Sequence, residues 1–181
     1  MINALVSLAA FAAGWLLYTL VEYAVHRWGG HSAFWTRGHR AHLVHHTNPR
    51  YFPGTHQQTA ILFFPVGAGA YLLFGGVAAA ALVVGGAFGW GLFEYVHRGL
   101  HNRQRAPRTA YGRWVCLHHL HHHFCDARTN HGITSPLWDM VFRTYTPVTE
   151  VVIRSRNAII PPWITNEALP PRMRQRFRLE A

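Results

Sequence analysis

The stretch LHHLHHHF, residues 117–124, decides how the rest of the chain is interpreted, because five of its eight residues are histidine and no other ionisable side chain stands among them. Neutral imidazole is the commonest metal ligand in proteins, and its nitrogen suits iron, zinc and copper. His119, His122 and His123 form the pattern H-x-x-H-H, which places three imidazoles on one face of a helix. The spacing therefore predicts a set of metal ligands.

The same pattern occurs earlier in the chain, at His42, His45 and His46. We call this triplet the upstream bank, and the triplet inside residues 117–124 the downstream bank. Three nitrogens on one helical face are too few to hold two ions with a defined geometry. We therefore expect the two banks to close on a single dinuclear centre, although more than seventy residues separate them.

Two further histidine pairs stand beside the banks. His26 and His31 form H-x4-H, and residues i and i+5 diverge on an unbroken α-helix. The glycines at 29 and 30 are therefore predicted to end the helix and let His31 turn back toward the site. His97 and His101 form H-x3-H, whose i, i+4 spacing makes a compact chelating pair.

An uncharged run opens the chain over residues 2–21. As a helix, its 20 residues reach about 30 Å at about 1.5 Å per residue, enough to cross a bilayer. A secretory signal is the alternative, but no positively charged segment precedes the run, and it leads directly into Glu22 and Tyr23. We therefore predict a retained membrane span over about 2–25.

A second uncharged run covers residues 59–93. Its 35 residues would reach about 50 Å as one helix, which is too long for an upright span. Gly75 and Gly76 lie near its middle and predict a hairpin of two short helices, about 59–75 and 77–96, that enters the membrane and returns. A single tilted span would instead leave the two banks on opposite sides of the bilayer.

The charge is strongly basic, with 17 arginines, no lysine and a net charge of +10. No basic helix or aromatic RNA-binding motif accompanies it, so nucleic acid is not expected as a partner. Since every arginine lies at or after Arg27, the bias instead predicts a cytoplasmic side for the histidines. Residues 161–181 are predicted to form a solvated basic tail, with attraction to anionic lipid headgroups as the functional alternative. Cys116 and Cys125 are expected to be free thiols.

Three carboxylates stand near the histidine motifs. The segments LVEYAVHR at 20–27 and LFEYVHR at 92–98 form a short internal repeat. Its glutamates, Glu22 and Glu94, either hydrogen-bond a ligand imidazole or pair with arginine, and both alternatives stay open. For Asp139 we favour an arginine partner over the orientation of a ligand.

The ordered motifs H-x4-H, H-x-x-H-H, H-x3-H and H-x-x-H-H resemble the fatty acid hydroxylase and sterol desaturase superfamily of membrane-bound diiron enzymes. The segment HLHHHFCDARTNHGITSPLWDMVFRTY, residues 119–145, is similar to that family's closing segment and selects His119 rather than His118 as a ligand. The resemblance extends over about 14–145 and is greatest to the fatty acid 2-hydroxylase branch. The chain departs from the family at His131, where phenylalanine is usual, and at Arg143, where glycine is usual.

The resemblance implies an all-α integral membrane protein with one N-terminal span, a helical hairpin and a cytoplasmic histidine-rich cap. We expect a single domain over 1–181 in a bacterial cytoplasmic membrane, with catalytic parts at 26–50 and 97–145. The implied cofactors are two iron ions, which zinc can replace in purified protein, and dioxygen is the co-substrate. Ten histidines are the expected ligands: His26, His31, His42, His45, His46, His97, His101, His119, His122 and His123.

The implied reaction is hydroxylation of a fatty acyl chain of a membrane lipid. An unactivated C–H bond has no acidic proton and no leaving group, so a redox metal must carry the chemistry. Desaturation of a sterol or hydroxylation of a carotenoid would suit the same ligands. A non-enzymatic metal-binding protein is less favoured, because its histidines would be expected in a single flexible, histidine-rich loop. Without a heme, flavin or nicotinamide motif, we expect electrons from a separate ferredoxin, cytochrome b5 or reductase.

The other five histidines are expected beside the ligands, at a polar surface or, for His56, in a loop; they are His39, His56, His118, His121 and His131.

Overall fold

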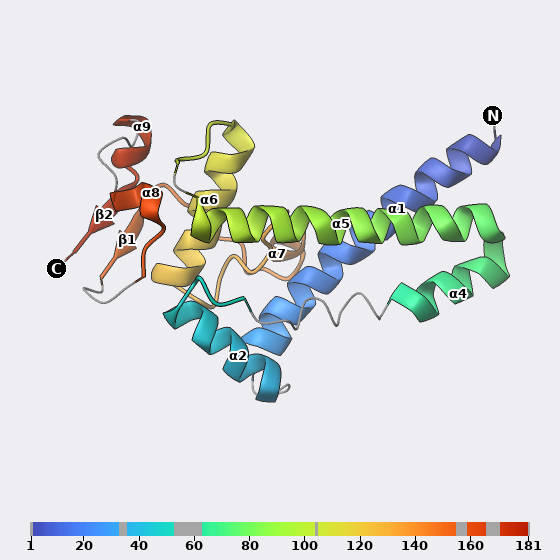
Figure 1. Ribbon diagram of the computed structural model, residues 1–181, viewed down its shortest axis with the longest axis horizontal. Helices are drawn as coiled ribbons and strands as arrows, with labels where there is room; N and C mark the ends of the chain where they lie inside the picture. Colours follow the sequence, from blue (N-terminus) through green and yellow to red (C-terminus); the bar gives the residue numbers. More distant parts are fainter. Residues whose placement is uncertain are drawn as a thin grey trace.

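A computed structural model describes residues 2–32, 36–52, 63–103, 105–154, 159–165 and 171–180, and this part of the chain is mainly helical (Figure 1). Its elements in chain order are α1 Ile2–Ala24, the π-helix η1 Val25–Gly30, α2 Thr36–Thr47, α4 Phe63–Phe74, α5 Gly76–Asn102, α6 Ala110–Phe124, α7 Leu137–Val141, β1 Val151–Ile153, α8 Pro162–Thr165, α9 Pro171–Arg174 and β2 Phe177–Leu179.

Within the described residues, two helical stretches are long and apolar enough to cross a membrane, Ala4–Gly30 and Gly76–Asn102. The predicted hairpin break is confirmed, because Gly75 separates α4 from α5 with a φ of +83° that favours glycine. The two arms differ in length: α4 has 12 residues, whereas α5 has 27, extends past the predicted 77–96 to Asn102 and is long enough to span a bilayer alone. Residues 59–62 of the predicted first arm lie outside the described residues.

The helices α1 and α5 cross in direct backbone contact (Figure 1). A Cβ atom on Gly14 would lie 1.9 Å from the Leu82 carbonyl oxygen, and one on Gly85 would lie 2.0 Å from that of Phe11. Small residues permit this approach, as is typical of membrane helices. The contact orients the C-terminal ends of both helices toward the side of the molecule where α2 and α6 lie.

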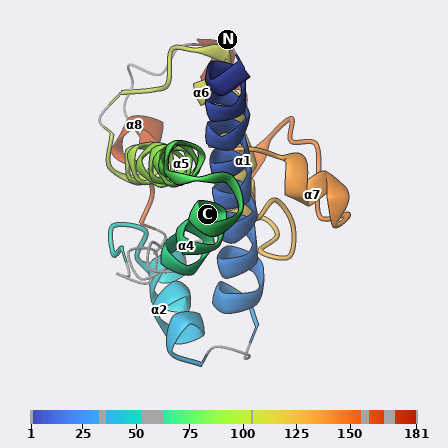
Figure 2. The ribbon, with the colours of Figure 1, turned by 90° about the vertical axis from the view of Figure 1, so that its right-hand side faces the viewer.

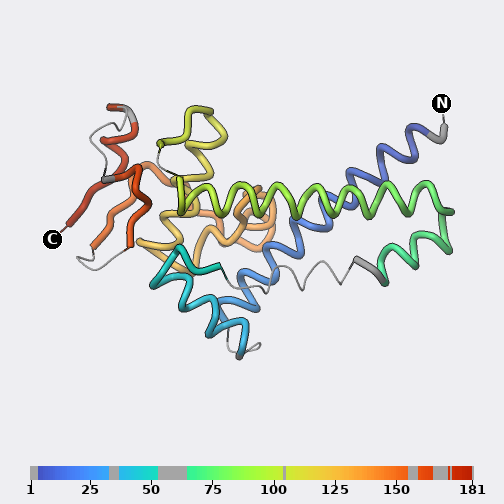
Figure 3. The backbone as a smooth tube through the Cα atoms, viewed as in Figure 1, coloured from blue at the N-terminus to red at the C-terminus, as the bar shows by residue number. Residues whose placement is uncertain are grey.

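The hairpin turn lies near the N-terminus, and the C-terminus lies at the opposite end of the molecule (Figure 3). Viewed along the long axis, α5 and α7 lie on opposite sides of α1 (Figure 2). The chain therefore has one end built from the N-terminal part of α1 and the α4–α5 turn. All the elements that carry the predicted ligands gather toward the other end.

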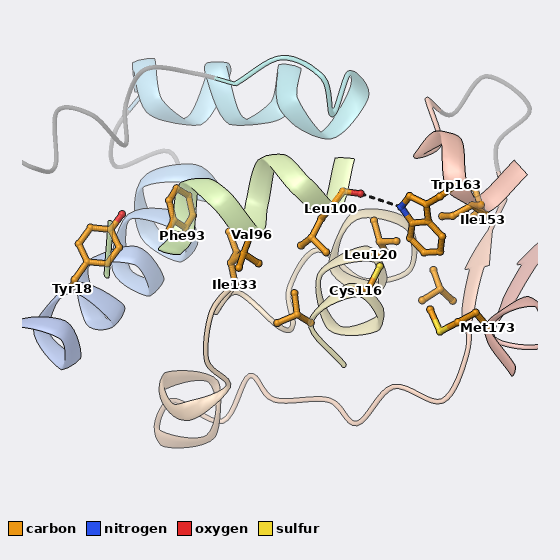
Figure 4. Packing of buried hydrophobic residues seen from close by; sticks show 13 residues of the cluster. Tyr18, Phe93, Val96, Leu100, Cys116, Leu120, Ile133, Ile153, Trp163 and Met173 are labelled. Atoms are coloured by element: carbon orange, nitrogen blue, oxygen red, sulfur yellow. Dashed lines mark hydrogen bonds between the residues drawn. The ribbon is translucent and has the colours of Figure 1, made fainter. Parts of the chain in front are cut away.

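A hydrophobic core joins the long helices to the C-terminal part (Figure 4). It runs from Tyr18 and Phe93 past Leu100 to Trp163, whose Nε1 donates to the Leu100 carbonyl oxygen at 3.4 Å. The strands β1 and β2 pair in parallel, with Val151 opposite Phe177.

The predicted solvated tail is therefore only partly correct. Its described arginines at 174, 176 and 178 are exposed, but Trp163 and Met173 are 2% and 3% exposed. Apolar residues of this basic segment are buried in the core, and the net charge of the segment does not reveal this burial.

Candidate metal centre

The structure brings all ten predicted ligands together in two clusters of five histidines. Within each cluster, the five candidate ligand atoms lie within 4.8 Å of one another. The first cluster contains His26, His31, His42, His46 and His122. The second cluster contains His45, His97, His101, His119 and His123.

The two banks interleave, so that neither cluster is built from one bank alone. His42 and His46 lie in the first cluster, while His45 from the same helix lies in the second. The downstream bank is divided by the same rule, since only its middle member, His122, joins the first cluster. On a helix, residues i and i+4 differ by about 40°, whereas i+3 is rotated about 60° the other way. Each bank therefore contributes to both clusters, and the two clusters are linked through both helices.

A π-helical turn brings His31 back to His26. The expected helix end at the two glycines is confirmed, but the chain first widens into η1, whose i→i+5 pattern places the two rings 5.3 Å apart. Gly30 also leaves room for a neighbouring ligand, because a Cβ there would lie 2.8 Å from Cδ2 of His42. The glycines thus permit close approach of η1 and α2.

The imidazole nitrogens of the clusters face one another. His31 Nε2 lies 2.9 Å from Nε2 of both His42 and His122. In the second cluster, Nε2 of His45 lies 3.0 Å from Nε2 of His97. Three buried ring nitrogens have no hydrogen-bond partner among the described residues: Nε2 of His26 and both nitrogens of His123. Converging lone pairs with no carboxylate among them fit a bound cation, and nitrogen ligands fit iron or zinc.

Burial keeps these imidazoles neutral. It lowers the pKa of His46 to about 3 and, with smaller contributions from nearby imidazoles, the pKa of His31 to about 4. Burial likewise lowers the pKa of His45 to about 4 and holds those of His119 and His122 well below the ordinary histidine value. At neutral pH the clusters therefore present unprotonated nitrogens, the form that binds metals.

Backbone carbonyls fix the tautomer of three candidate ligands. His26 Nδ1 lies 2.5 Å from the His131 carbonyl oxygen, and Nδ1 of His45 and of His122 lie 2.7 Å from the carbonyl oxygens of Tyr51 and Thr129. Because a carbonyl oxygen only accepts, Nδ1 carries the proton and Nε2 keeps its lone pair for the cluster. These acceptors belong to the backbone, so no residue type in the sequence signals them.

Comparison with known proteins agrees with this arrangement, since the family model described as "Fatty acid hydroxylase" matches residues 11–144. The chain belongs to the fatty acid hydroxylase family. A dihydroceramide fatty acyl 2-hydroxylase of Arabidopsis thaliana is 36% identical over 143 residues, 74% of this chain and 59% of the relative. A fatty acid 2-hydroxylase of Rattus norvegicus is 28% identical over 152 residues, 78% of this chain and 41% of the relative. The chain thus spans less than two thirds of the length of these relatives.

A solved structure shares the fold of this fatty acid hydroxylase family member. It is described as full-length scs7p with only the hydroxylase domain visible, and it superposes with a TM-score of 0.63 at 29% identity. The match covers 79% of this chain and 57% of that chain. The two relatives described above confirm the predicted resemblance to the 2-hydroxylase branch, and the solved structure agrees with a hydroxylase fold.

In this family member, Glu22 holds a loop rather than a ligand. Its Oε1 accepts from the backbone N–H groups of Ile133 at 2.6 Å and Thr134 at 2.9 Å, and its Oε2 accepts from the Thr134 hydroxyl at 2.7 Å. Neither alternative for Glu22 holds among the described residues, where its partners are two backbone N–H groups and a hydroxyl. For Glu94 the arginine alternative is confirmed, with Arg98 Nε 2.5 Å away.

Asp139 holds the same loop from the other side. It accepts from the backbone N–H groups of His131 and Gly132, each at 2.8 Å, and from the Thr144 hydroxyl at 2.8 Å. Its one imidazole partner is His118 at 3.3 Å, which belongs to neither cluster. The favoured arginine partner is therefore wrong. Glu22 and Asp139 together fix the loop whose His131 carbonyl orients a first-cluster ligand.

The described histidines outside the clusters support them or lie apart. His39 Nδ1 donates to the Gly30 carbonyl oxygen at 2.7 Å. The His131 ring lies 5.1 Å from that of His122, and its Nε2 donates to the Arg128 carbonyl oxygen at 3.1 Å. His121 is half-buried, and the prediction for His56 lies outside the described residues.

Proposed function

We propose that the chain is a membrane-bound diiron oxygenase that uses dioxygen and external electrons to hydroxylate the acyl chain of a lipid. The observation that carries the proposal is the convergence of ten histidines from four helical elements and one helix cap into two neighbouring clusters of five. The two relatives are fatty acid or fatty acyl 2-hydroxylases, which favours hydroxylation of an acyl chain over desaturation of a sterol or hydroxylation of a carotenoid.

Each cluster has the donors to hold one ion. Five neutral imidazoles leave the positive charge of the metal uncompensated, which suits a Lewis-acidic and redox-active site. Two iron ions, when bound, would pass the external electrons to dioxygen and so supply the redox chemistry that attack on a C–H bond requires. Zinc also binds imidazole nitrogen and could occupy the same sites, but it would supply no redox chemistry.

An apolar cavity of about 810 Å³ lies between α1, α4 and α5. Its lining includes Tyr71 near the hairpin turn, Ala87, and Trp90 and Tyr18 at the end nearer the histidines. Phe93 continues this line, with its ring 6.3 Å from Tyr18 and 5.2 Å from His97 of the second cluster. An acyl chain in the cavity would lie between membrane helices and approach the clusters past Phe93, while the apolar lining excludes water.

The topology follows from the shared end of the clusters and from the arginine bias. We infer an N-terminus outside the cytoplasm, all ten ligands on the cytoplasmic side of a bacterial inner membrane, and a separate electron-donor protein. Reporter fusions after Arg50 and after Arg105 should report the same compartment. Opposite compartments would contradict the two-cluster site.

The direct test combines metal analysis of purified protein with lipid mass spectrometry of an expressing strain. We expect two iron ions per chain and new lipids heavier by one oxygen atom. A protein without metal, or a strain with an unchanged lipid profile in the presence of iron-loaded protein, would contradict the proposal.

The role of the cavity is tested separately with the Ala87→Phe variant. The added ring would fill part of the cavity beside Trp90 and should reduce oxidation of long acyl chains without removing metal. Val77→Phe is the matched control, because Val77 lies on the same helix, is 71% exposed and does not line the cavity.

A further inference from the structure

A second pocket, of about 450 Å³, lies where α5 ends and α6 begins. Residues 105–109 of the connection between the two helices form one wall, and the first turn of α6 forms another. Leu100, Val115, Cys116 and Trp163 give the pocket an apolar floor. Three exposed arginines line it: Arg103, Arg105 and Arg108.

These three arginines are not neutralised by carboxylates. The pocket lining contains no aspartate or glutamate. Among the described residues, every ion pair of arginine with a carboxylate involves other arginines, and none lies within 4.0 Å of these three. A concave site with three positive charges and no internal counter-charge is suited to an anionic ligand.

The side chain of Arg103, the C-cap residue of α5, is held in place by an aromatic ring. Its guanidinium carbon lies 4.9 Å from the centre of the Tyr95 ring, a cation–π contact. Gly99 makes room for this arrangement, since a Cβ there would lie 2.6 Å from Arg103 Nε. An ordered guanidinium loses little further entropy when it binds a phosphate through two parallel hydrogen bonds.

The start of α6 adds to the positive potential. Thr109 caps this 15-residue helix by accepting from the Gly112 N–H at 3.0 Å, and the first turn contains no acidic residue. The positive end of the helix dipole therefore faces the same pocket as the arginines.

The pocket is separated from the histidine clusters by α5 itself. The residues of α5 that line the pocket are Tyr95, Val96, Gly99 and Leu100, and the C-cap residue Arg103 continues this face. Neither His97 nor His101 lines the pocket, since each is rotated by about 100° from the lining residue before it and by about 200° from the one before that. A molecule in this pocket therefore occupies a different face from one that reaches the second cluster.

We propose that this pocket binds the phosphate group of an anionic membrane phospholipid, with the glycerol and first methylenes on the apolar floor. The pocket lies at the C-terminal end of α5, a helix long and apolar enough to cross a membrane, and an arginine cluster just beyond such a span is expected close to the lipid headgroups. Inorganic phosphate shares the recognised chemistry but cannot use the floor. The proposal is independent of the proposed hydroxylation, because it needs neither metal nor turnover.

The test measures lipid binding to the full chain purified in detergent. Phosphatidylglycerol is compared with phosphatidylcholine of the same acyl chains and with inorganic phosphate, by native mass spectrometry and by the shift in thermal unfolding. The R103Q/R105Q/R108Q variant should bind phosphatidylglycerol about tenfold more weakly or worse, as expected for the loss of charged hydrogen bonds. The control R37Q/R40Q/R50Q removes the same charge from exposed positions outside the pocket and should bind like the wild type.

Three results would overturn the proposal. Equal weakening in the control would show diffuse attraction to the basic surface, and equal binding of phosphatidylcholine would show no phosphate-charge selectivity. Saturation by inorganic phosphate at the same concentration would show a site for the free anion. Metal content serves as the check that the variant is still folded. The R105Q/R108Q variant, which leaves the Arg103–Tyr95 contact intact, should also bind phosphatidylglycerol more weakly than the wild type.

Discussion

Replacing Glu22 with alanine should weaken metal binding by the first histidine cluster while largely sparing the second. Glu22 accepts hydrogen bonds from the backbone of Ile133 and Thr134, just after His131. The His131 carbonyl oxygen accepts from His26 Nδ1 at 2.5 Å and thereby orients a ligand of the first cluster. In the second cluster, His45 is oriented by the Tyr51 carbonyl oxygen, which lies on another segment.

The size of the effect follows from the two buried N–H groups that lose their acceptor. Each costs about 1–3 kcal/mol when left unsatisfied, so the free energy that holds the loop should fall by about 2–6 kcal/mol. Loss of a partner that orients a ligand typically lowers metal affinity about 10–100-fold. We expect this loss for the ion of the first cluster, which depends on the loop that Glu22 holds.

The assay is the number of metal ions per chain after equilibration with increasing chelator. The wild type should lose its two ions over similar chelator concentrations, whereas Glu22→Ala should lose one ion much earlier. Glu94→Ala is the matched control, because Glu94 occupies the equivalent place in the internal repeat and pairs with Arg98 instead of the loop. Simultaneous loss of both ions, or wild-type retention of both, would refute the reasoning.

Three further predictions concern the clusters and the loop. His45→Ala and His122→Ala each remove one histidine, from different clusters. Both variants should lose lipid oxidation and contain less metal, and full activity in either variant would exclude that histidine from the site. Arg143 is exposed and has a φ of +57°, so Arg143→Gly should stabilise the protein by about 1 kcal/mol in denaturant unfolding, because glycine adopts this conformation without strain. In metal-free protein, the pKa of His31 and of His45 is about 4, below their value of about 6.5 in an unfolded chain. The unfolded state therefore binds more protons in this range, and stability should be full above pH 6.5 and fall as the pH drops toward about 4, which melting curves at stepped pH would show.

The sequence by itself determined which side chains are candidate ligands and which segments are membrane helices. Both follow from local pattern: i, i+3 and i+4 lie near one another on a helix, and an uncharged run of 20 or more residues is long enough as a helix to cross the lipid. The division of each bank between two clusters was not predicted, but it agrees with the helical angles, since the middle residue of a bank is rotated by about 60° from the first and the last residue by about 40° in the other direction. Gly75 likewise marked the hairpin turn from sequence alone.

Only the tertiary structure decided what the buried carboxylates and the C-terminal segment do. Glu22 meets Thr134 across 112 positions of sequence, and its partners are mainly backbone groups that no side-chain pattern encodes. Trp163 is buried because α5 and α6 offer it an apolar surface, although it stands in a segment rich in arginine. Local spacing sets the direction in which a side chain points, but burial and hydrogen bonding depend on which distant segment arrives there.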